Sequence, residues 1–536
     1  MRALSLSHIS FSWPDGRPVF TDLTFSVPTG LSGIVGRNGI GKSTLLRLAV
    51  GEYSPTSGHV ERPARLAYVP QSVTLAVEAT VAQVLGVAER LLALRAIEAG
   101  SDDLTLYETL ADDWLVEERA IGVLSSLGLD SLELDRTVGH VSGGEATLLA
   151  IGAALLAEPD VLLLDEPTNN LDAFARDRLL AALAARGGAT AVVTHDRGVL
   201  ARVDRIGELR ERDDRTTELR WFGGAIDAFE EALAAERETA EQAVVTASAD
   251  VARQHRDLRA RVESGGKRHD RAKKALANHE VTRIGVKAKT DQAAKTEARV
   301  TAAHRARLAQ ARDALAMAKA AIPRDRSIKL DLPGTTVPQR RAVLDATGVV
   351  TRAGTELSTL IQGPERIHLT GRNGSGKTTL IETLLGLIPP MAGDALLQVP
   401  AGYLAQRLDV LDDSLSVFEN VRLRAVGASP QEVRDQLGKF QFRGSSVDAL
   451  AATLSGGERF RAALASVLLA RPEPQLLILD EPTNNLDFES QAQLVQALEG
   501  YGGALIVVSH DESFVDQIAP TREWELLGSE VRDRQT

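Results

Sequence analysis

The chain has 536 residues, of which 44% are hydrophobic, and this length allows about three or four domains with sizeable cores. It contains no cysteine, which excludes disulfides, thiolate zinc sites and iron–sulfur clusters. The formal net charge is −12, yet residues 251–312 hold 17 Lys and Arg against 6 Asp and Glu. The N-terminus lacks the apolar core of a signal peptide, and the longest uncharged helix-like run, 146–157, is too short to span a bilayer. We therefore expect a soluble, cytoplasmic protein.

A glycine-rich segment near the N-terminus has the sequence of a nucleotide-binding P-loop, GRNGIGKS. Its glycines let backbone N–H groups close around phosphates, its lysine reaches the β- and γ-phosphates, and its hydroxyl ligates Mg²⁺. The sequence thus predicts ATP and Mg²⁺ as cofactors. The residues expected to bind ATP here are Gly36, Arg37, Asn38, Gly39, Gly41, Lys42, Ser43 and Thr44, with Ser43 also on the metal.

A helix-like insertion follows Gln71, and a short SGGE motif follows the insertion. The insertion is expected on the surface of the helical part of this domain. Ser142, Gly143, Gly144 and Glu145 open a helix, so that the hydroxyl and the N–H groups direct a positive helix end at an anion. A simple N-cap is the alternative explanation. The motif recurs before a second acidic strand end, which favours the anion site.

Two predicted strands carry further polar residues at their ends. The apolar run 161–164 ends in Asp165 and Glu166, and the run 191–194 ends in His195. Uninterrupted apolar runs of this length indicate strands buried on both faces of a mainly parallel sheet. We expect Asp165 to hold Mg²⁺ through water and Glu166 to act as general base on the attacking water. His195 lies 29 residues after Glu166, and a γ-phosphate contact is preferred over a purely structural histidine.

The middle of the chain, 225–322, contains no proline and is rich in Ala, Glu, Arg and Lys. Residues 230–263 and 291–321 are predicted to form two long helices, with Gly265, Gly266 and Gly285 marking a turn-forming tip at 264–290. An antiparallel hairpin follows. A flexible spacer is the alternative, but spacers are Gly/Ser-rich or Pro-rich, whereas this segment is stiff and basic.

The remainder of the chain repeats the first motifs in the same order. Gly36 and Gln71 match residues 335 positions later, and Asp165 and His195 match residues 315 positions later. The stretch from Gln71 to Ser142 is 22 residues longer than its counterpart. The corresponding residues of the second copy are Gly371, Arg372, Asn373, Gly374, Gly376, Lys377, Thr378, Thr379, Gln406, Ser455, Gly456, Gly457, Glu458, Asp480, Glu481 and His510.

The chain resembles the ATP-binding cassette superfamily, because it carries the same six motifs in the same order twice. These are the P-loop, the glutamine, the SGGE signature, the acidic strand end, the Asn-Asn-Leu-Asp run and the histidine. The resemblance implies an α/β fold of two P-loop cassettes, each with a helical subdomain, at 1–225 and 327–536, joined by the hairpin at 226–326. The cassettes of one monomer would enclose two ATP molecules, each P-loop facing the signature of the other copy. The resemblance implies metal contacts for Ser43, Gln71, Asp165, Thr378, Gln406 and Asp480, and catalytic roles for Glu166, Glu481, His195 and His510.

The chain resembles the ABC-F subfamily, because it combines two cassettes and a helical linker without a membrane span. Members of this subfamily act on the ribosome. The resemblance implies binding at the tRNA exit site, with the hairpin directed towards peptidyl-tRNA and the peptidyl transferase centre. Either antibiotic resistance or translation regulation fits; the long tip and short insertion favour resistance. DNA is not an expected partner. The tip residues expected to contact RNA are Lys267, Arg268, Arg271, Lys273, Lys274, Arg283, Lys287 and Lys289.

Two other functions compete with this prediction. The chain could be the ATPase subunit of a membrane transporter whose spanning subunits are separate, although such a subunit does not need a basic hairpin. It could also be a DNA-acting coiled-coil ATPase, although those proteins split the nucleotide motifs across a long coil. The cysteine-dependent recycling class is excluded by composition.

The two ATP sites are predicted to differ. Trp13 is placed to stack on adenine in the first site, whereas the matching residues 347–351 contain no aromatic side chain. The tip contains no aromatic residue either, so that its RNA contacts are expected to act through charge.

Overall fold

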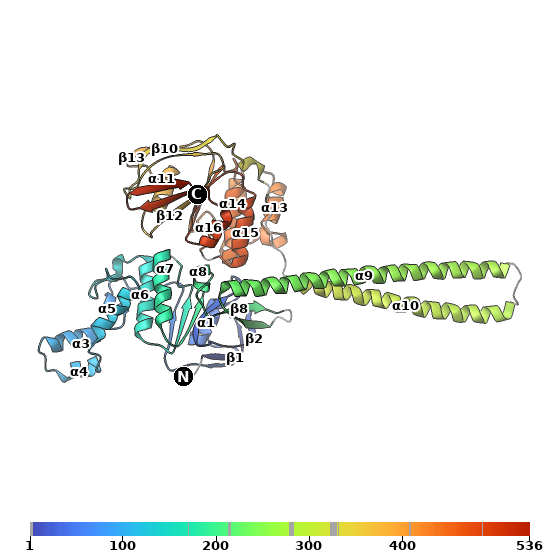
Figure 1. Ribbon diagram of the computed structural model, residues 1–536, viewed down its shortest axis with the longest axis horizontal. Coiled ribbons are helices and arrows are strands. Elements are labelled where there is room, and N and C mark those ends of the chain that lie inside the picture. Colours follow the sequence, from blue (N-terminus) through green and yellow to red (C-terminus); the bar gives the residue numbers. More distant parts are fainter. Residues whose placement is uncertain are drawn as a thin grey trace. The chain divides into compact units, whose positions relative to one another are not determined.

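The computed structural model describes residues 4–169, 171–212, 216–277, 283–321, 330, 332–406, 409–484 and 486–535. Side chains of residues 265–297 lie outside the described part. The chain divides into two compact units: one comprises 1–226 and 326–536, and the other 227–325. Figure 1 shows the cassettes as sheets with helices on their faces and the hairpin as two long helices.

The first cassette contains two sheets. A three-stranded antiparallel sheet has the order β2-β1-β4, formed by β2 (Pro18–Ser26), β1 (Ser5–Ser12) and β4 (Ser57–Glu61). A six-stranded sheet has the order β5 (Leu66–Val69), β6 (Val161–Asp165), β7 (Ala189–Val193), β3 (Gly30–Val35), β8 (Arg205–Glu211) and β9 (Thr217–Gly223). All its neighbouring strands are parallel except β8 and β9. The predicted mainly parallel sheet is therefore confirmed.

Buried strands bring the polar residues to one edge of this sheet. Every residue of β6 and β7 is buried, as continuous apolar runs predict. The carboxyl ends of β3, β6 and β7 meet where the P-loop leads into α1 (Lys42–Val50), and ligands of open α/β sheets bind at such edges.

The helical part of the first cassette comprises α2 (Val81–Val84), α3 (Ala88–Glu98), α4 (Leu104–Leu110), α5 (Val116–Ser126), η1 (Val138–His140) and α6 (Gly143–Leu156). Helices α7 (Ala173–Ala185) and α8 (Arg197–Leu200) flank β7 in sequence. Helices α3 and α4 occupy the predicted insertion. Arginines of α3 pair with acids beyond α4: Arg90 with Asp113 at 2.9 Å, and Arg95 with Glu117 at 2.7 Å.

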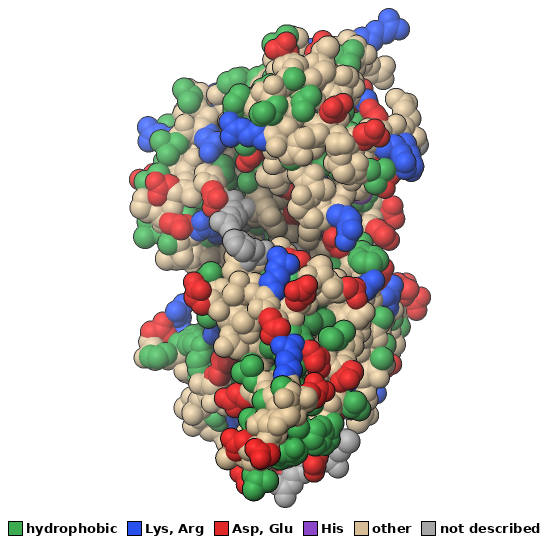
Figure 2. Space-filling view, turned by 90° about the vertical axis from the view of Figure 1, so that its left-hand side faces the viewer, with side chains coloured by type: hydrophobic (Ala, Val, Ile, Leu, Met, Phe, Trp, Pro, Cys, Tyr) green, Lys and Arg blue, Asp and Glu red, His purple; other side chains and the backbone are tan. Residues whose placement is uncertain are grey.

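The surface around α4 is acidic and partly apolar. Residues 98–118 contain eight Asp and Glu and no Lys or Arg. Leu104, Tyr107, Trp114 and Leu115 are exposed among them. In Figure 2, hydrophobic and acidic side chains adjoin one another in the lower half, where α3 and α4 face the viewer. The neighbouring arginines Arg90 and Arg95 are paired with acids, so this surface is poorly suited to bind nucleic-acid phosphates.

The second cassette is built on one nine-stranded sheet. Its order is β13 (Ala392–Leu397), β10 (Ala342–Val350), β11 (Glu356–Gln362), β18 (Glu530–Gln535), β17 (Arg522–Leu527), β12 (Arg366–Gly371), β16 (Ala504–Val508), β15 (Leu476–Asp480) and β14 (Ala401–Leu404). The strands β17, β12, β16, β15 and β14 are parallel neighbours. The strand order β5-β6-β7-β3-β8 thus recurs as β14-β15-β16-β12-β17, and the predicted duplication holds at the level of topology.

The helices of the second cassette repeat the first arrangement without an insertion. They are α11 (Lys377–Leu384), α12 (Val417–Arg424), α13 (Pro430–Lys439), α14 (Gly456–Leu468), α15 (Phe488–Glu499) and α16 (Glu512–Ile518), with short 3-10 turns at η2 (Pro333–Thr335), η3 (Gly444–Asp448) and η4 (Ala451–Thr453). Thr80 before α2 and Ser416 before α12 form equivalent capping boxes. Only α13 then lies between α12 and the signature helix, where the first cassette has three helices.

The second unit consists of α9 (Ile226–Ala277) and α10 (Arg283–Ala321), which run in opposite directions (Figure 1). Both helices are longer than predicted: α9 continues through Gly265 and Gly266, and α10 begins at Arg283 rather than near 291. A helical glycine costs only about 1 kcal/mol, and the surrounding Ala, Lys and Arg favour helix, so this glycine pair does not end α9. Helix therefore occupies much of the segment 264–290 that was predicted as a turn, and residues 278–282 lie outside the described part.

Candidate ATP sites

Each P-loop closes around its own lysine. The Lys42 ammonium donates to the carbonyl oxygen of Gly36 at 2.6 Å and to that of Arg37 at 3.3 Å. Lys377 donates to Gly371 at 2.7 Å and to Arg372 at 3.1 Å. Burial lowers the pKa of both lysines, partly opposed by the nearby acids.

A left-handed glycine begins each P-loop helix. Gly41 has φ 108° and Gly376 has φ 96°. A Cβ atom on Gly41 would lie 2.7 Å from Val19 and 2.8 Å from Phe20; one on Gly376 would lie 2.9 Å from Ala353. The glycines are thus required by backbone conformation and by space.

The acids at the ends of β6 and β15 contact the P-loop hydroxyls. The Thr378 hydroxyl donates to Asp480 at 2.9 Å, and the Ser43 hydroxyl bonds Asp165. Burial raises the pKa of both aspartates, and these hydrogen bonds oppose the rise. The predicted metal-binding hydroxyls and carboxylates therefore lie together in both copies.

Two tyrosines also reach these aspartates, and the sequence did not single them out for that contact. The Tyr68 hydroxyl lies 3.4 Å from Asp165, and the Tyr403 hydroxyl lies 3.4 Å from Asp480. The parallel register places each tyrosine opposite the strand that ends in the acid. Burial, then the nearby aspartate, raises the pKa of Tyr68 to about 12, so that it remains a donor at neutral pH.

Glu166 and Glu481 adopt a backbone conformation that non-glycine residues rarely adopt. Their φ angles are 48° and 50°, a conformation that costs about 1–3 kcal/mol. Each amide donates across the sheet, Glu166 to Val193 at 2.8 Å and Glu481 to Val508 at 2.9 Å. Burial raises the pKa of Glu166 to about 8 and that of Glu481 to about 7, opposed by the P-loop lysines.

The two histidines face these glutamates. Nε2 of His195 lies 3.8 Å from Oε1 of Glu166, and Nε2 of His510 lies 3.3 Å from Oε1 of Glu481. Burial, and then the P-loop lysine, lowers the pKa of His195 to about 3 and that of His510 to about 4. Both rings are therefore neutral at pH 7.

Unsatisfied buried atoms at these positions fit a polar ligand. Oδ1 of Asp165, both ring nitrogens of His195 and Nε2 of His510 are buried without a hydrogen-bond partner. Such atoms are rare unless a ligand, ion or water completes them. Within the described ranges, no cluster of three or more His, Asp or Glu side chains is arranged to hold a metal ion. A cation at Asp165 or Asp480 therefore needs further oxygens, such as those of phosphates.

Each P-loop also contacts the opposite cassette. The amide of Asn38 donates to Asp487 at 2.8 Å, and that of Asn373 donates to Asp172 at 3.3 Å. The other oxygen of each aspartate caps its own helix, α15 or α7. A Cβ atom on Gly456 would lie 3.8 Å from Nδ2 of the Asn38 side chain. The second signature therefore lies against the first P-loop.

Both signatures begin helices with capping boxes. The Ser142 hydroxyl accepts from the amide of Glu145, whose carboxylate accepts from the amide of Ser142. Ser455 and Glu458 repeat the arrangement before α14. Both serines are therefore N-caps. The capping bond uses one N–H group of each helix and leaves other N–H groups of the first turn available to an anion.

Several predicted residues lie apart from this set. Gln71 and Gln406 are exposed just after β5 and β14. Trp13 packs edge-on against Phe11 and Tyr53, with ring centroids 5.3 and 5.7 Å away. The aromatic cluster was not evident from sequence, because Tyr53 lies 40 residues after Trp13. The basic side chains of the predicted hairpin tip lie outside the described part.

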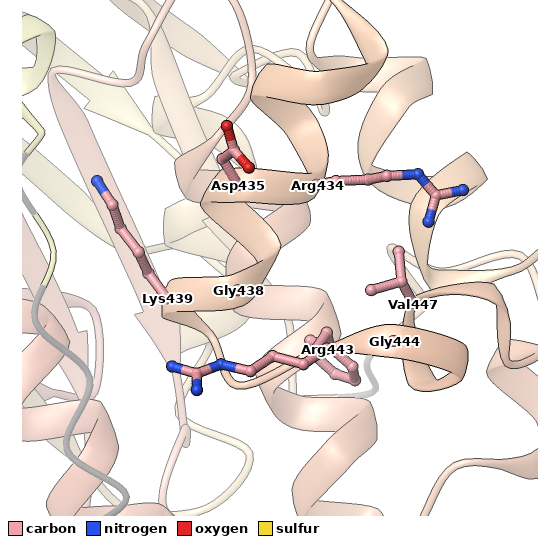
Figure 3. A pocket seen from close by; sticks show the side chains of 8 residues that line it. Arg434, Asp435, Gly438, Lys439, Arg443, Gly444 and Val447 are labelled. Carbon is pink, nitrogen blue, oxygen red and sulfur yellow. The ribbon is translucent and has the colours of Figure 1, made fainter.

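A separate pocket lies in the helical part of the second cassette. Its volume is about 590 Å³, and its lining includes Arg434, Lys439, Phe442 and Arg443. Arg434 points away from Lys439 and Arg443 (Figure 3) and pairs with Asp448 at 2.9 Å. The cations therefore do not converge on one ligand position.

Comparisons with known proteins agree with this geometry. The family model described as "ABC transporter" matches residues 20–169 and 355–484. The chain is 33% identical to the "Tylosin resistance ATP-binding protein TlrC" of Streptomyces fradiae, over 93% of this chain and 92% of that protein. The chain belongs to the ABC-F family. This ABC-F chain is also 31% identical to the "Probable ATP-binding protein YheS" of Haemophilus influenzae, over 89% of this chain and 72% of that protein.

Solved structures share the fold of this ABC-F protein. The structure titled "RNase-L Inhibitor" matches with a TM-score of 0.57 and 19% identity, over 98% of this chain and 90% of that one. The tandem-cassette architecture is therefore confirmed. Among the described residues, no helix is both long and apolar enough to cross a lipid bilayer.

Proposed function

We propose that this ABC-F protein hydrolyses ATP to ADP and phosphate at two composite sites, each formed by both cassettes of one monomer. The contacts of Asn38 with Asp487 and of Asn373 with Asp172 support the pairing. They bring each P-loop to the loop that follows the acids of the other cassette. We divide the chain functionally into cassettes at 1–225 and 327–536 and a hairpin at 226–326.

In this mechanism the chain supplies binding, proton transfer and water positioning. The lysines bind the β- and γ-phosphates, and the ionised form of Glu166 or Glu481 accepts a proton from the water that attacks the γ-phosphorus. Neutral His195 and His510 hold the γ-phosphate. The P-loop hydroxyls and the aspartates at the strand ends would hold Mg²⁺, directly or through water, and the ion would supply positive charge to offset that of the phosphates.

We further propose that the protein is cytoplasmic, binds the ribosome at the tRNA exit site, and protects it from an antibiotic through its hairpin. One observation carries this proposal: similarity over nearly the full length to a protein named for tylosin resistance. The excess of 17 cations over 6 acids in residues 251–312 supports RNA as the hairpin's target. Peptidyl-tRNA and ribosomal RNA near the peptidyl transferase centre are the proposed contacts.

The test combines a catalytic variant with drug susceptibility. Glu166→Gln with Glu481→Gln should retain ATP binding and lose turnover by at least about 100-fold, since an amide cannot accept the proton. Expression of the wild type in a sensitive host should raise the inhibitory concentration of tylosin, and the double variant should not. Macrolides, lincosamides, pleuromutilins and phenicols complete the panel.

Two results would contradict the proposal at different levels. Near-normal ATP turnover in the double variant would show that Glu166 and Glu481 are not the general bases. Recovery of the wild type with membranes rather than ribosomes at low salt would instead favour the transporter alternative.

A further inference from the structure

The two cassettes differ at the residues that follow Asp172 and Asp487. Offset 315 pairs Ala173 with Phe488 and Phe174 with Glu489. It also pairs Arg176 with Gln491, so only α7 carries an arginine at this position. Because α7 and α15 begin beside the opposite P-loop, these differences act at the ATP sites rather than on remote surfaces.

Arg176 connects the histidine segments of the two cassettes. Its Nη1 lies 3.5 Å from Asp196, the residue after His195. The same nitrogen donates to the backbone carbonyl of His510 at 3.4 Å. The side chain of Arg176 is only 14% exposed. One mostly shielded guanidinium therefore contacts segments that carry the histidines of two different ATP sites.

The surroundings of Arg176 are shaped to admit it. Gly198 has no side chain, and a Cβ there would lie 3.1 Å from both the guanidinium carbon of Arg176 and the Asp196 carboxylate. The matching residue of the second cassette is Ser513. Only the first cassette therefore has a glycine at this position.

Different contacts surround His195. The rings of His195 and Phe488 form an edge-to-face pair with centroids 5.6 Å apart, and the guanidinium carbon of Arg197 lies 5.4 Å from the centroid of the Phe488 ring. The counterparts of Phe488 and Arg197 are Ala173 and Glu512, which cannot form this aromatic arrangement at His510. His195 is held by an aromatic contact, whereas the His510 segment is held through its backbone by Arg176.

We propose that Arg176 is a positioning residue that couples the two ATP sites, by holding the His510 segment of the second site against Asp196 of the first. The inference rests on the proposed ATP hydrolysis and goes beyond it by naming the residue that links the sites. The link is asymmetric, because the second cassette has Gln491 where the first has Arg176.

The test is a double-mutant cycle in the purified full-length protein. Arg176→Gln introduces the residue found at position 491, and Asp196→Asn removes the charge while leaving an oxygen to cap α8. Each single variant should lower kcat for ATP about 3- to 10-fold with KM changed less than about twofold, because positioning rather than binding is lost. The double variant should be no slower than the slower single variant, since both break one interaction.

A matched pair and a cooperativity measurement complete the design. Gln491→Ala and Asp511→Asn change the equivalent residues of the second cassette. Their effects on kcat should multiply in the double variant, because these two residues are not expected to interact. Arg202→Gln, which removes the exposed ion pair with Asp177 beside Arg176, is the control for a neighbouring surface contact of α7 that does not reach the second cassette. The Hill coefficient for ATP should exceed 1 in the wild type and fall to 1 in Arg176→Gln, while Arg176→Lys should partly restore it.

The outcomes separate the two levels of inference. Multiplicative effects of Arg176→Gln and Asp196→Asn, or an unchanged Hill coefficient, would overturn the coupling while ATP hydrolysis stands. A wild-type protein without ATP turnover would overturn the proposed activity and the coupling together.

Discussion

Glu166 and Glu481 combine a strained backbone with burial, and both features come from their place at the end of a strand. The left-handed φ lets each amide continue the sheet hydrogen bonding to Val193 or Val508 while the side chain turns towards the P-loop. The sequence predicted the acids from an apolar run followed by Asp-Glu. It could not predict the backbone strain, because glutamate has no local preference for this conformation and the neighbouring strand imposes it.

His510 gives a residue-scale prediction about pH. Its folded pKa of about 4 lies below the ordinary value of about 6.5, so the unfolded chain binds more protons between these values. Stability is therefore lost as pH falls from about 6.5 towards 4. Between pH 7.5 and 5, the unfolding free energy of the wild type should fall about 1–2 kcal/mol further than that of His510→Gln.

Chemical unfolding of both proteins at the two pH values measures this difference. Glu481, whose raised pKa contributes the opposite dependence, is present in both, so that the comparison isolates the histidine. Equal losses in the two proteins would show that His510 titrates normally in the folded state.

At the scale of elements, the P-loop helices depend on glycines with positive φ. Gly41→Ala forces a side chain into left-handed backbone and against Val19 and Phe20. We expect the unfolding free energy to fall by about 2–4 kcal/mol, from backbone strain and overpacking together.

Gly386→Ala is the matched control, because Gly386 has φ 71° with open space around its Cβ position. Gly386→Ala should lower the unfolding free energy by about 1 kcal/mol, because it adds backbone strain without crowding. Urea unfolding of both variants separates the two terms. A loss for Gly41→Ala no larger than that of the control would show that the crowding is relieved without cost.

Element prediction succeeded where patterns are long and failed where local signals compete. The buried strands β6, β7 and β16 follow from continuous apolar runs, and the insertion follows from comparing the two copies. The ends of the two hairpin helices were not predicted correctly from the sequence. Gly265 and Gly266 indicate a turn locally, whereas their Ala, Lys and Arg neighbours favour helix. The contacts of Tyr68 and Arg176 depend on register and on the opposite cassette, which no local pattern encodes.

At the scale of the whole molecule, charge separates the surfaces that can meet RNA from those that cannot. The charged residues within 98–118 are all acidic, whereas residues 251–312 of the hairpin hold 17 Lys and Arg against 6 Asp and Glu. Replacement of Lys267, Arg268, Arg271, Lys273 and Lys274 by Ala should weaken ribosome binding and flatten its dependence on salt. Each lost phosphate contact should reduce the slope of log affinity against log salt by about 0.7–0.9.

Cosedimentation with ribosomes across a range of salt concentrations measures this slope. A variant with five acidic residues around α4 changed to Asn or Gln is the comparison, and its slope should not decrease. The same affinity and slope in the hairpin variant and the wild type would show that the basic segment only keeps the hairpin solvated.

The ion pair of Arg37 with Glu489, at 3.2 Å, has a consequence for how such a protein can be assembled. Arg372, its counterpart, instead lies 5.7 Å from the ring of Phe174. Because both P-loops carry an arginine here, the residue of the opposite cassette decides the contact: Glu489 gives an ion pair and Phe174 gives a cation–π contact. Two first halves paired with each other would make the aromatic contact at both interfaces, and two second halves would make the ion pair at both. Only a chain with two unlike halves has one interface of each kind. Fusing the two unlike halves into one chain therefore fixes two chemically distinct interfaces in every molecule.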